Sequence, residues 1–198
     1  MQFDYDARLD GLLSSIEATL IAELPAAIRR LSIAEPCYAL FIWYEDSGVD
    51  DFAPLFGIGT QSVLDACEVQ YSSDADSRIG CIWSPQQTLE DSDLIRRHSI
   101  DKPGFSEQCN SAYSLMLAAN KSELPLDDES VILLPFRSML YRVASKLTDA
   151  DWTGILRTDD RFVVVASDCT GYWLSDDFEA CVPSRKRKLL EKQGLWPA

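Results

Sequence analysis

Histidine is almost absent from this sequence: the only one is His98. A single histidine excludes a metal site built from several, and a Ser-His-Asp triad would have to be centred on it. Arg96 and Arg97 precede it and disfavour its protonation, so an ordinary position at a helix end is the simpler interpretation. The chain also lacks both common glycine-rich phosphate motifs. Residues 57–60, Gly-Ile-Gly-Thr, favour a tight strand-to-helix turn over an anion site.

Basic residues are scarce as well. The chain has 18 lysines and arginines against 32 aspartates and glutamates, which gives a net charge of −14 at pH 7. This negative excess repels nucleic acids and anionic membranes and favours a basic partner. Residues 184–198 are the exception, because five bases and one acid give them a net charge of +4. We expect a basic helix at about 184–194 whose bases pair with the chain's own acids; a nucleic-acid or localisation patch is the alternative.

Signals for export, membrane insertion and metal binding by paired cysteines are missing too. The N-terminus has two acids before any base, unlike a signal peptide, and no uninterrupted apolar stretch reaches the ~18 residues of a membrane span. The six cysteines form no Cys-x-x-Cys pair, which excludes zinc-ribbon and thioredoxin-like spacings. We therefore expect a cytoplasmic protein with six reduced, mostly buried cysteines.

The hydrophobic pattern predicts a helix at residues 6–31, because leucine and isoleucine recur there at three- and four-residue steps. Pro25 is expected to break or kink this helix. Residues 37–45 are aromatic and β-branched on both faces, which is typical of a central strand. A turn signal and a second strand at 52–58 follow, so the two strands predict an antiparallel hairpin with a long loop.

Weaker sequence signals predict the helices, strands and loop in the rest of the chain. Helices are expected at 61–71 with Thr60 as the cap, from Thr88 to 95, at 105–119, at 127–147 with an interruption at Pro135, after Thr148, at 176–180 and at 185–193. Strands are expected at 79–83, 162–166 and 172–174, and a polar loop at 72–77. This order favours a single α+β domain over residues 1–198, in which several helices cover a mainly antiparallel sheet.

Carboxylates occur in many short clusters, most of which suit solvated faces, caps or turns. The stretch from Asp74 begins like a calcium loop but lacks glycine at its sixth position and glutamate at its twelfth. A glycosidase pair cannot be named, because sequence does not give the separation of two carboxylates. We therefore predict no catalytic residue, metal ligand or cofactor. Contacts to a basic partner are expected from an acidic hairpin loop and the acids after it: Glu45, Asp46, Asp50, Asp51, Asp74 and Asp76.

Two stretches resemble a bacterial family known as domain of unknown function 4303. The first is Cys-Tyr-Ala-Leu-Phe-Ile-Trp-Tyr at 37–44, followed by Phe-Gly-Ile-Gly-Thr at 56–60 and a helix. The second is Phe-Val-Val-Val-Ala-Ser-Asp at 162–168, with a late helix and Leu-Trp-Pro at 195–197. Proteins that look like this often accompany bacterial polymorphic toxins. The resemblance implies an immunity protein, and it transfers no site residues.

Together, the acidic composition and this resemblance predict a stoichiometric inhibitor rather than an enzyme. It would bind a cognate toxin, a basic effector that acts in the cytoplasm, and occlude the toxin's active site. Two alternatives stay open. One is a hydrolase that reverses a toxin's modification, which needs acids that converge in a pocket. The other is a regulatory adaptor that uses the basic C-terminal helix. Neither nucleic acid nor membrane is expected as a partner.

Overall fold

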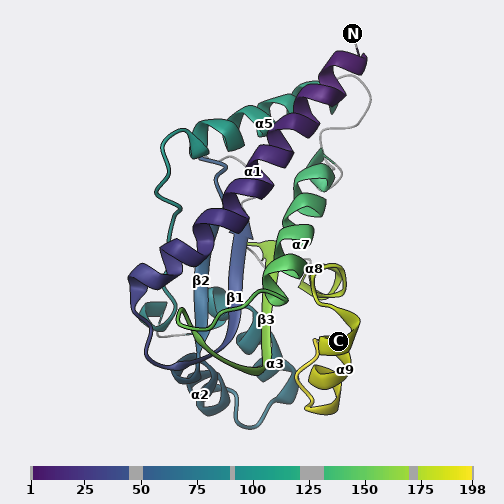
Figure 1. Ribbon diagram of the computed structural model, residues 1–198. Coiled ribbons are helices and arrows are strands. Elements are labelled where there is room, and N and C mark those ends of the chain that lie inside the picture. Colours follow the sequence, from purple (N-terminus) through teal and green to yellow (C-terminus); the bar gives the residue numbers. More distant parts are fainter. Residues whose placement is uncertain (1, 45–50, 90–91, 121–131, 170–173, 198) are drawn as a thin grey trace.

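The computed structural model describes residues 2–44, 51–89, 92–120, 132–169 and 174–197. Within them the strands form one three-stranded sheet in the order β2-β1-β3, and helices surround it, which confirms the α+β class (Figure 1). The elements, in chain order, are α1 (Gln2–Leu31), β1 (Pro36–Tyr44), β2 (Leu55–Thr60), α2 (Gln61–Gln70), α3 (Ala75–Trp83), α4 (Pro85–Thr88), the 3₁₀ turn η1 (Ser92–Leu94), α5 (Phe105–Asn120), α7 (Leu134–Thr148), β3 (Arg157–Asp168), α8 (Leu174–Cys181) and α9 (Ser184–Lys192).

The sheet is mixed. β1 pairs with β2 in antiparallel register, with Ile42 opposite Phe56, so the predicted hairpin and the central position of β1 are confirmed. β1 pairs with β3 in parallel register, with Tyr44 opposite Asp168 at the carboxyl ends. The sheet is therefore not mainly antiparallel. The parallel pair arises because β3 returns to β1 after a long connection that contains several helices, as parallel strands require.

α1 is a single helix, and the predicted break at Pro25 does not occur. A proline inside a helix costs ~3 kcal/mol, and the packing of the rest of the helix offsets this cost. A stripe of buried leucine and isoleucine side chains along α1 packs against α5 and α7. The carboxylate of Glu17 adds ion pairs to Arg142 and Lys146 of α7, at 2.8 and 2.7 Å. Figure 1 shows α1 and α7 side by side across the sheet.

Among the described residues, one helical segment, Asp6–Leu31, is long and apolar enough to cross a membrane by length and composition. The core helix of a soluble protein meets the same criteria. Here the apolar stripe is covered by protein, since its buried residues include Leu13, Ile16, Leu20 and Ile28. We therefore treat α1 as part of the core.

Aromatic rings of β1 fill the space that two glycines of β2 leave free. Phe41 and Trp43 stack with their ring centroids 5.6 Å apart. A Cβ atom on Gly57 would lie 2.6 Å from Cζ3 of Trp43, and one on Gly59 would lie 2.6 Å from Cζ of Tyr38. Both glycines belong to β2 itself rather than to the predicted strand-to-helix turn. Their role is to let large rings of the central strand cover the edge strand.

Residues 79–83 are the end of helix α3 and not the predicted strand. Asp74 determines this outcome, because its Oδ1 accepts hydrogen bonds from the amides of Asp76 and Ser77, at 3.1 and 3.2 Å. These bonds satisfy amides that have no partner inside the first helical turn. The polar stretch predicted as a loop thus contains a helix cap, and the apolar residues that follow continue the helix.

A disulfide joins α2 to α3. Cys67 and Cys81 are bonded, with their Cα atoms 5.7 Å apart, so the expectation of six reduced cysteines is wrong for this pair. No sequence pattern indicates this bond, because the pairing depends on how the two helices pack and part of α3 was expected to be a strand. Three of the free cysteines, Cys37, Cys109 and Cys181, are buried as expected.

Several other helix boundaries differ from the sequence expectations. Pro135 lies in the first turn of α7, where a missing amide loses no hydrogen bond. Residue 132 is helical, residue 133 forms a turn and α7 begins at Leu134, so the expected interruption occurs just before Pro135, while residues 127–131 of the expected helix lie outside the described residues. Thr88 ends α4 and does not open a helix; among the described residues between Thr88 and Ile95, the only helical turn is η1. Thr148 ends α7 and opens no further helix before β3. Of the strand expected at 172–174, the first two residues lie outside the described residues, and residue 174 begins α8.

The N-terminus of α2 is capped by a residue that is distant in sequence. Thr60 stands at the cap position but makes no capping hydrogen bond with its side chain. Instead, the amide and hydroxyl of Ser62 donate to Oε2 of Glu35, at 3.0 and 2.6 Å. These hydrogen bonds hold the pKa of Glu35 below its usual range. The carboxylate therefore serves as the cap that the sequence assigned to Thr60.

Side chains close the outer edge of β3. The amide of Val164 donates to Oγ1 of Thr148 at 2.8 Å, and the amide of Ala166 lies 3.4 Å from the sulfur of Cys181. These contacts come from α7 and α8, which cover the edge. An edge closed in this way cannot easily pair with another chain.

The predicted basic helix is confirmed as α9, and its arginines face the chain's own acids. Arg185 pairs with Asp149, and Arg187 pairs with Glu179 of α8. Gly194 follows the helix with a φ of +67°, as expected for a residue that ends a helix. The positive charge of this segment is thus partly neutralised inside the fold.

Replacing Gly57 with alanine should lower the free energy of unfolding by about 1–3 kcal/mol, because the added methyl group overlaps the packed ring of Trp43. Gly11→Ala is the matched control. Gly11 lies inside α1 with nothing within 4 Å of an added Cβ, and alanine there should stabilise the protein by about 0.5–1 kcal/mol. Urea unfolding followed by tryptophan fluorescence measures both changes. A Gly57→Ala protein as stable as the wild type would contradict the packing of Trp43 against β2.

Candidate functional site

Five polar side chains meet where β1 and β3 end. Tyr44 ends β1 and Asp168 ends β3, and the parallel register places them side by side. Arg137 and Tyr141 lie one turn apart on α7, and Asp177 lies in the first turn of α8. We refer to these five residues as the polar cluster. Ligands of α/β sheets commonly bind at the carboxyl ends of parallel strands, so this is the natural place to look for chemistry.

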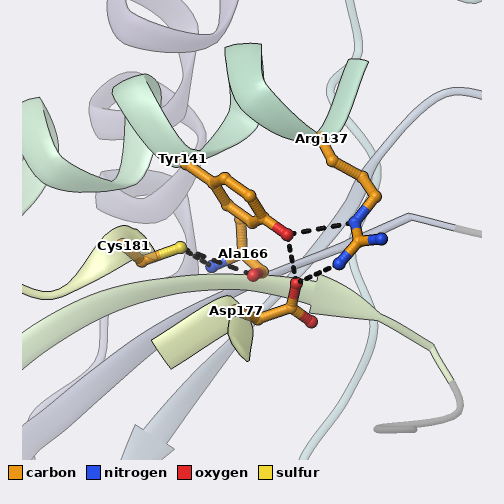
Figure 2. A network of polar contacts seen from close by, with 5 residues as sticks. All are labelled: Arg137, Tyr141, Ala166, Asp177 and Cys181. Carbon is orange, nitrogen blue, oxygen red and sulfur yellow. Dashed lines mark hydrogen bonds and ion pairs between the residues drawn. The ribbon is translucent and has the colours of Figure 1, made fainter. Parts of the chain in front are cut away.

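One carboxylate oxygen joins α7 to α8 in the polar cluster (Figure 2). The Arg137 guanidinium lies 3.3 Å from Oδ1 of Asp177, and its Nε donates to the hydroxyl of Tyr141 at 3.0 Å. The Tyr141 hydroxyl in turn donates to the same Oδ1. Figure 2 also shows the thiol of Cys181 beside the backbone of Ala166. The two ends of α8 are therefore fixed separately, the first to α7 and the second to β3.

Burial sets the protonation of the polar cluster. It raises the pKa of Asp177 to about 6, although hydrogen bonds and charge from Tyr141 and Arg137 act in the opposite direction. The charge of Asp168, which is also fully buried, adds to the increase. Burial would lower the pKa of Arg137, but its aromatic and acidic neighbours raise it, so the guanidinium stays charged. Burial also raises the pKa of Tyr44 and of Tyr141, so both phenols keep their protons.

Two buried atoms of the polar cluster have no hydrogen-bond partner within the described residues: the hydroxyl oxygen of Tyr44 and Oδ2 of Asp177. Their residues are 1% and 0% exposed. An unpaired buried polar atom costs ~1–3 kcal/mol, which favours the uptake of a water molecule or a proton at this point. A carboxyl group that titrates near neutrality beside a phenol can give and accept a proton. Across the described ranges, no three histidine, cysteine or acidic side chains group as metal ligands do.

The acids predicted to bind a partner do not join the polar cluster. Glu45, Asp46 and Asp50 lie outside the described residues. Asp51 is exposed, and its carboxylate accepts a hydrogen bond of 2.6 Å from the hydroxyl of Ser106 in the first turn of α5. A negative charge at that end of a helix is favourable. Asp51 therefore has a structural role at the start of α5, whatever else it contacts.

Asp74 and Asp76 lie in a second acidic region. They are exposed at the start of α3, and Asp65 and Glu68 are exposed on α2, the helix that packs against α3. Val69 of α2 is 79% exposed, the largest value among the exposed large hydrophobic residues of the described chain. Residues 61–77 contain no lysine or arginine, although Arg78 follows directly and Arg161 of β3 is close enough for the charge of Glu68 to act on it. We refer to these four acids and Val69 as the acidic face.

His98 has a different position from the one expected. Its backbone pairs with that of Phe56 through two hydrogen bonds of 2.8 Å, which adds one bridge to the outer edge of β2. Burial and the charge of Arg96 lower the pKa of His98. Pockets of about 300 and 410 Å³ adjoin its side chain. His98 is therefore not part of the polar cluster. It pairs with the outer edge of β2, which is the edge of the sheet opposite β3.

Sequence reasoning missed the polar cluster. One signal was available: Arg137 falls on the buried stripe of α7, where the helical period calls for an apolar residue. Tyr141 lies four residues further along and therefore on the same side of the helix. Asp177 was visible only as half of an acidic pair at a helix start. Nothing in the sequence indicates that these groups meet at the end of β1.

The comparisons with known proteins found no relative: no protein-family model, no curated protein and no solved structure matches this chain. The resemblance to the family of domain of unknown function 4303 therefore stays a prediction.

The titration of Asp177 should make the protein less stable as the pH rises. The pKa of this carboxyl is about 6 in the folded protein and 3.8 as a free side chain, so the folded state binds the proton more tightly. Its stabilising contribution is complete below pH 3.8 and is lost as the pH rises through 6. Asp177→Asn keeps an acceptor but cannot titrate. Relative to this variant, the wild type should lose about 2 kcal/mol of unfolding free energy between about pH 4.5 and about pH 7.

Urea unfolding of both proteins at the two pH values measures this change. The other carboxylates titrate in both proteins, so taking the difference removes their contribution. If the wild type and Asp177→Asn differ by the same amount at both pH values, Asp177 does not titrate in this range.

Proposed function

We propose that this protein is an immunity protein: a stoichiometric inhibitor that binds a basic toxin domain and covers its active site. The observation that carries the proposal is the acidic face. Four exposed carboxylates lie on α2 and α3, the same two packed helices that carry the exposed side chain of Val69 on α2. An apolar side chain among acids can enter a basic cleft while the acids pair with the positive groups at its rim. The complementary charges would also direct the two proteins toward each other.

The ion pairs of α9 support this proposal. Arg185 and Arg187 are occupied by Asp149, Glu179 and Glu191 of the same chain. The basic segment is therefore less able to bind an acidic partner, which reduces the support for an adaptor that uses this helix. The net charge of −14 then acts at long range on a basic toxin. Such attraction can raise association rates to ~10⁸–10⁹ M⁻¹s⁻¹ at low salt.

We further propose that the protein acts in the cytoplasm, where the toxin would act. Disulfides are uncommon in that compartment because glutathione and thioredoxin reduce them. Cys67 and Cys81 are fully buried, however, so a reductant would reach their bond only if α2 and α3 separated. The bond is therefore compatible with a reducing compartment as long as the two helices stay packed.

The polar cluster favours one alternative, a hydrolase that reverses a toxin's modification. A buried carboxyl with a pKa of about 6 suits a general acid, and Asp177 has this property. Asp177→Asn separates the two functions. An enzyme would lose its protective activity with this substitution while it stays folded, and its wild type would protect at less than one molecule per toxin. A stoichiometric inhibitor keeps its protection and needs one molecule per toxin.

The double variant Glu68→Lys/Asp76→Lys should bind the toxin about tenfold more slowly at low salt and show a weaker salt dependence, because two carboxylates of the acidic face are reversed. The purified products of the neighbouring genes are the probes, and stopped-flow fluorescence measures the association rate. Asp51 and Asp74 are unsuitable for this test, because one stabilises the start of α5 and the other caps α3.

Asp6→Lys/Asp10→Lys is the matched control, since it changes the net charge equally on the exposed side of α1. It should slow association much less. Equal slowing by both double variants would mean that net charge attracts the toxin without the acidic face. A wild-type protein that neither binds nor neutralises the toxin would contradict the proposed function itself.

A further inference from the structure

We propose that the acidic face is under redox control. A dithiol that reduces the bond between Cys67 and Cys81 loosens the segment that carries this face, and the loosened face binds a basic partner more weakly. The inference rests on the proposed function, because it concerns the regulation of the same surface. The part that concerns the segment itself can be tested without a partner.

The disulfide encloses most of the acidic face. Cys67 belongs to α2 and Cys81 to α3, and the two are 14 positions apart in the sequence. The residues between them include the exposed valine and three of the four acids of the face: Glu68, Val69, Asp74 and Asp76. The fourth acid, Asp65, lies two residues before Cys67. The bond therefore fixes both ends of the segment that presents these side chains.

The enclosed segment has no fully buried residue of its own. Residues 68–80, all of which the structure describes, are either exposed or half-buried. The core residues lie outside the segment on both sides: Val63, Leu64 and Cys67 before it, and Cys81, Ile82 and Trp83 after it, are 0–4% exposed. Segments with few buried apolar contacts open at a lower free-energy cost than the core. The two cysteines are therefore the last core residues at the ends of a weakly anchored segment.

The other contacts of this segment are weaker than a covalent bond. Tyr71 and Ile79 are half-buried against the core. The hydroxyl of Tyr71 and the side-chain amide of Gln70 donate to the carbonyl of Thr88, at 3.1 and 2.8 Å. The hydrogen bonds of the Asp74 carboxylate stay within the segment and do not attach it to the rest of the protein. A typical hydrogen bond adds little net stability, so the disulfide is the strongest anchor of this segment.

The redox step is thiol–disulfide exchange. A thiolate of the dithiol attacks one sulfur of the pair, the bond between Cys67 and Cys81 breaks, and a mixed disulfide forms that the second thiol of the dithiol resolves. The two cysteines gain two electrons and two protons and become thiols, while the dithiol becomes a disulfide. A small-molecule disulfide reverses the step.

Reduction changes how far the segment can open. With the bond intact, an opening is confined between Cys67 and Cys81. After reduction the two thiols are no longer tied, so the opening can extend into α2 and α3, and the acids lose their fixed spacing. A partner then has to order the face when it binds, which costs affinity.

Binding and reduction oppose each other. Both cysteines are fully buried, so a dithiol reaches their sulfurs only when the segment opens. A partner on the acidic face covers this segment and hinders the opening. By linkage, a partner that disfavours reduction binds more tightly to the oxidised protein than to the reduced one.

The first test uses the full chain without a partner, before and after treatment with dithiothreitol. Alkylation in denaturant should modify four thiols in the oxidised protein and all six cysteines after reduction. Hydrogen exchange of the amides of residues 68–80 should become about tenfold faster on reduction, while that of β1 should not change. Six thiols without the reductant, unchanged exchange in residues 68–80, or equally faster exchange in β1 would each overturn the proposal.

Two double variants locate the effect. Cys67→Ala/Cys81→Ala should exchange like the reduced protein and should not respond to dithiothreitol. Cys37→Ala/Cys109→Ala is the matched control, because it removes two buried thiols and keeps the disulfide. It should respond to dithiothreitol as the wild type does.

The second test uses the purified products of the neighbouring genes as probes. A product that binds the oxidised protein should bind the reduced protein about tenfold more weakly and should slow reduction by dithiothreitol about tenfold. Cys67→Ala/Cys81→Ala should bind as weakly as the reduced protein with or without dithiothreitol, which controls for an effect of the reductant on the probe. Equal binding of the oxidised and reduced proteins overturns this inference alone. If neither form binds any product, the proposed function fails and this inference fails with it.

Discussion

The burial of β1 on both faces is the constraint on which the rest of the structure depends. Eight of its nine residues are buried. A strand in this position needs a layer of side chains on each face and a backbone partner along each edge. α1 and α7 cover one face (Figure 1). On the other, Tyr38 of β1 packs against Trp83 of α3 and donates a hydrogen bond of 2.8 Å to the carbonyl of Ile82. β2 and β3 supply the backbone partners.

The polar cluster follows from the same constraint. β1 ends inside the protein, so its last side chain, Tyr44, and the paired Asp168 have to be surrounded by polar groups rather than by water. A buried ion pair adds little net stability compared with apolar packing. The contact of Arg137 with Asp177 is therefore better explained by what it positions. It holds the first turn of α8 against α7, and the outer edge of β3 is closed by the same two helices.

Sequence reasoning succeeded where burial repeats with a regular period. The central strand, its hairpin, α1, α5 and the basic helix were all visible in this way. It failed where one local contact outweighs the pattern. The residues at 79–83 have strand-like composition, yet the carboxylate of Asp74 starts a helix before them. Pro25 is a helix breaker by propensity, yet the packing of α1 retains the helix through it.

The candidate sites depend on contacts between distant parts of the chain, and so the sequence indicated their residue types but not their neighbours. Exposed acids were expected and found, although Asp51 and Asp74 turned out to stabilise helix starts. Arg137 and Asp177 are 40 residues apart and meet only through the fold.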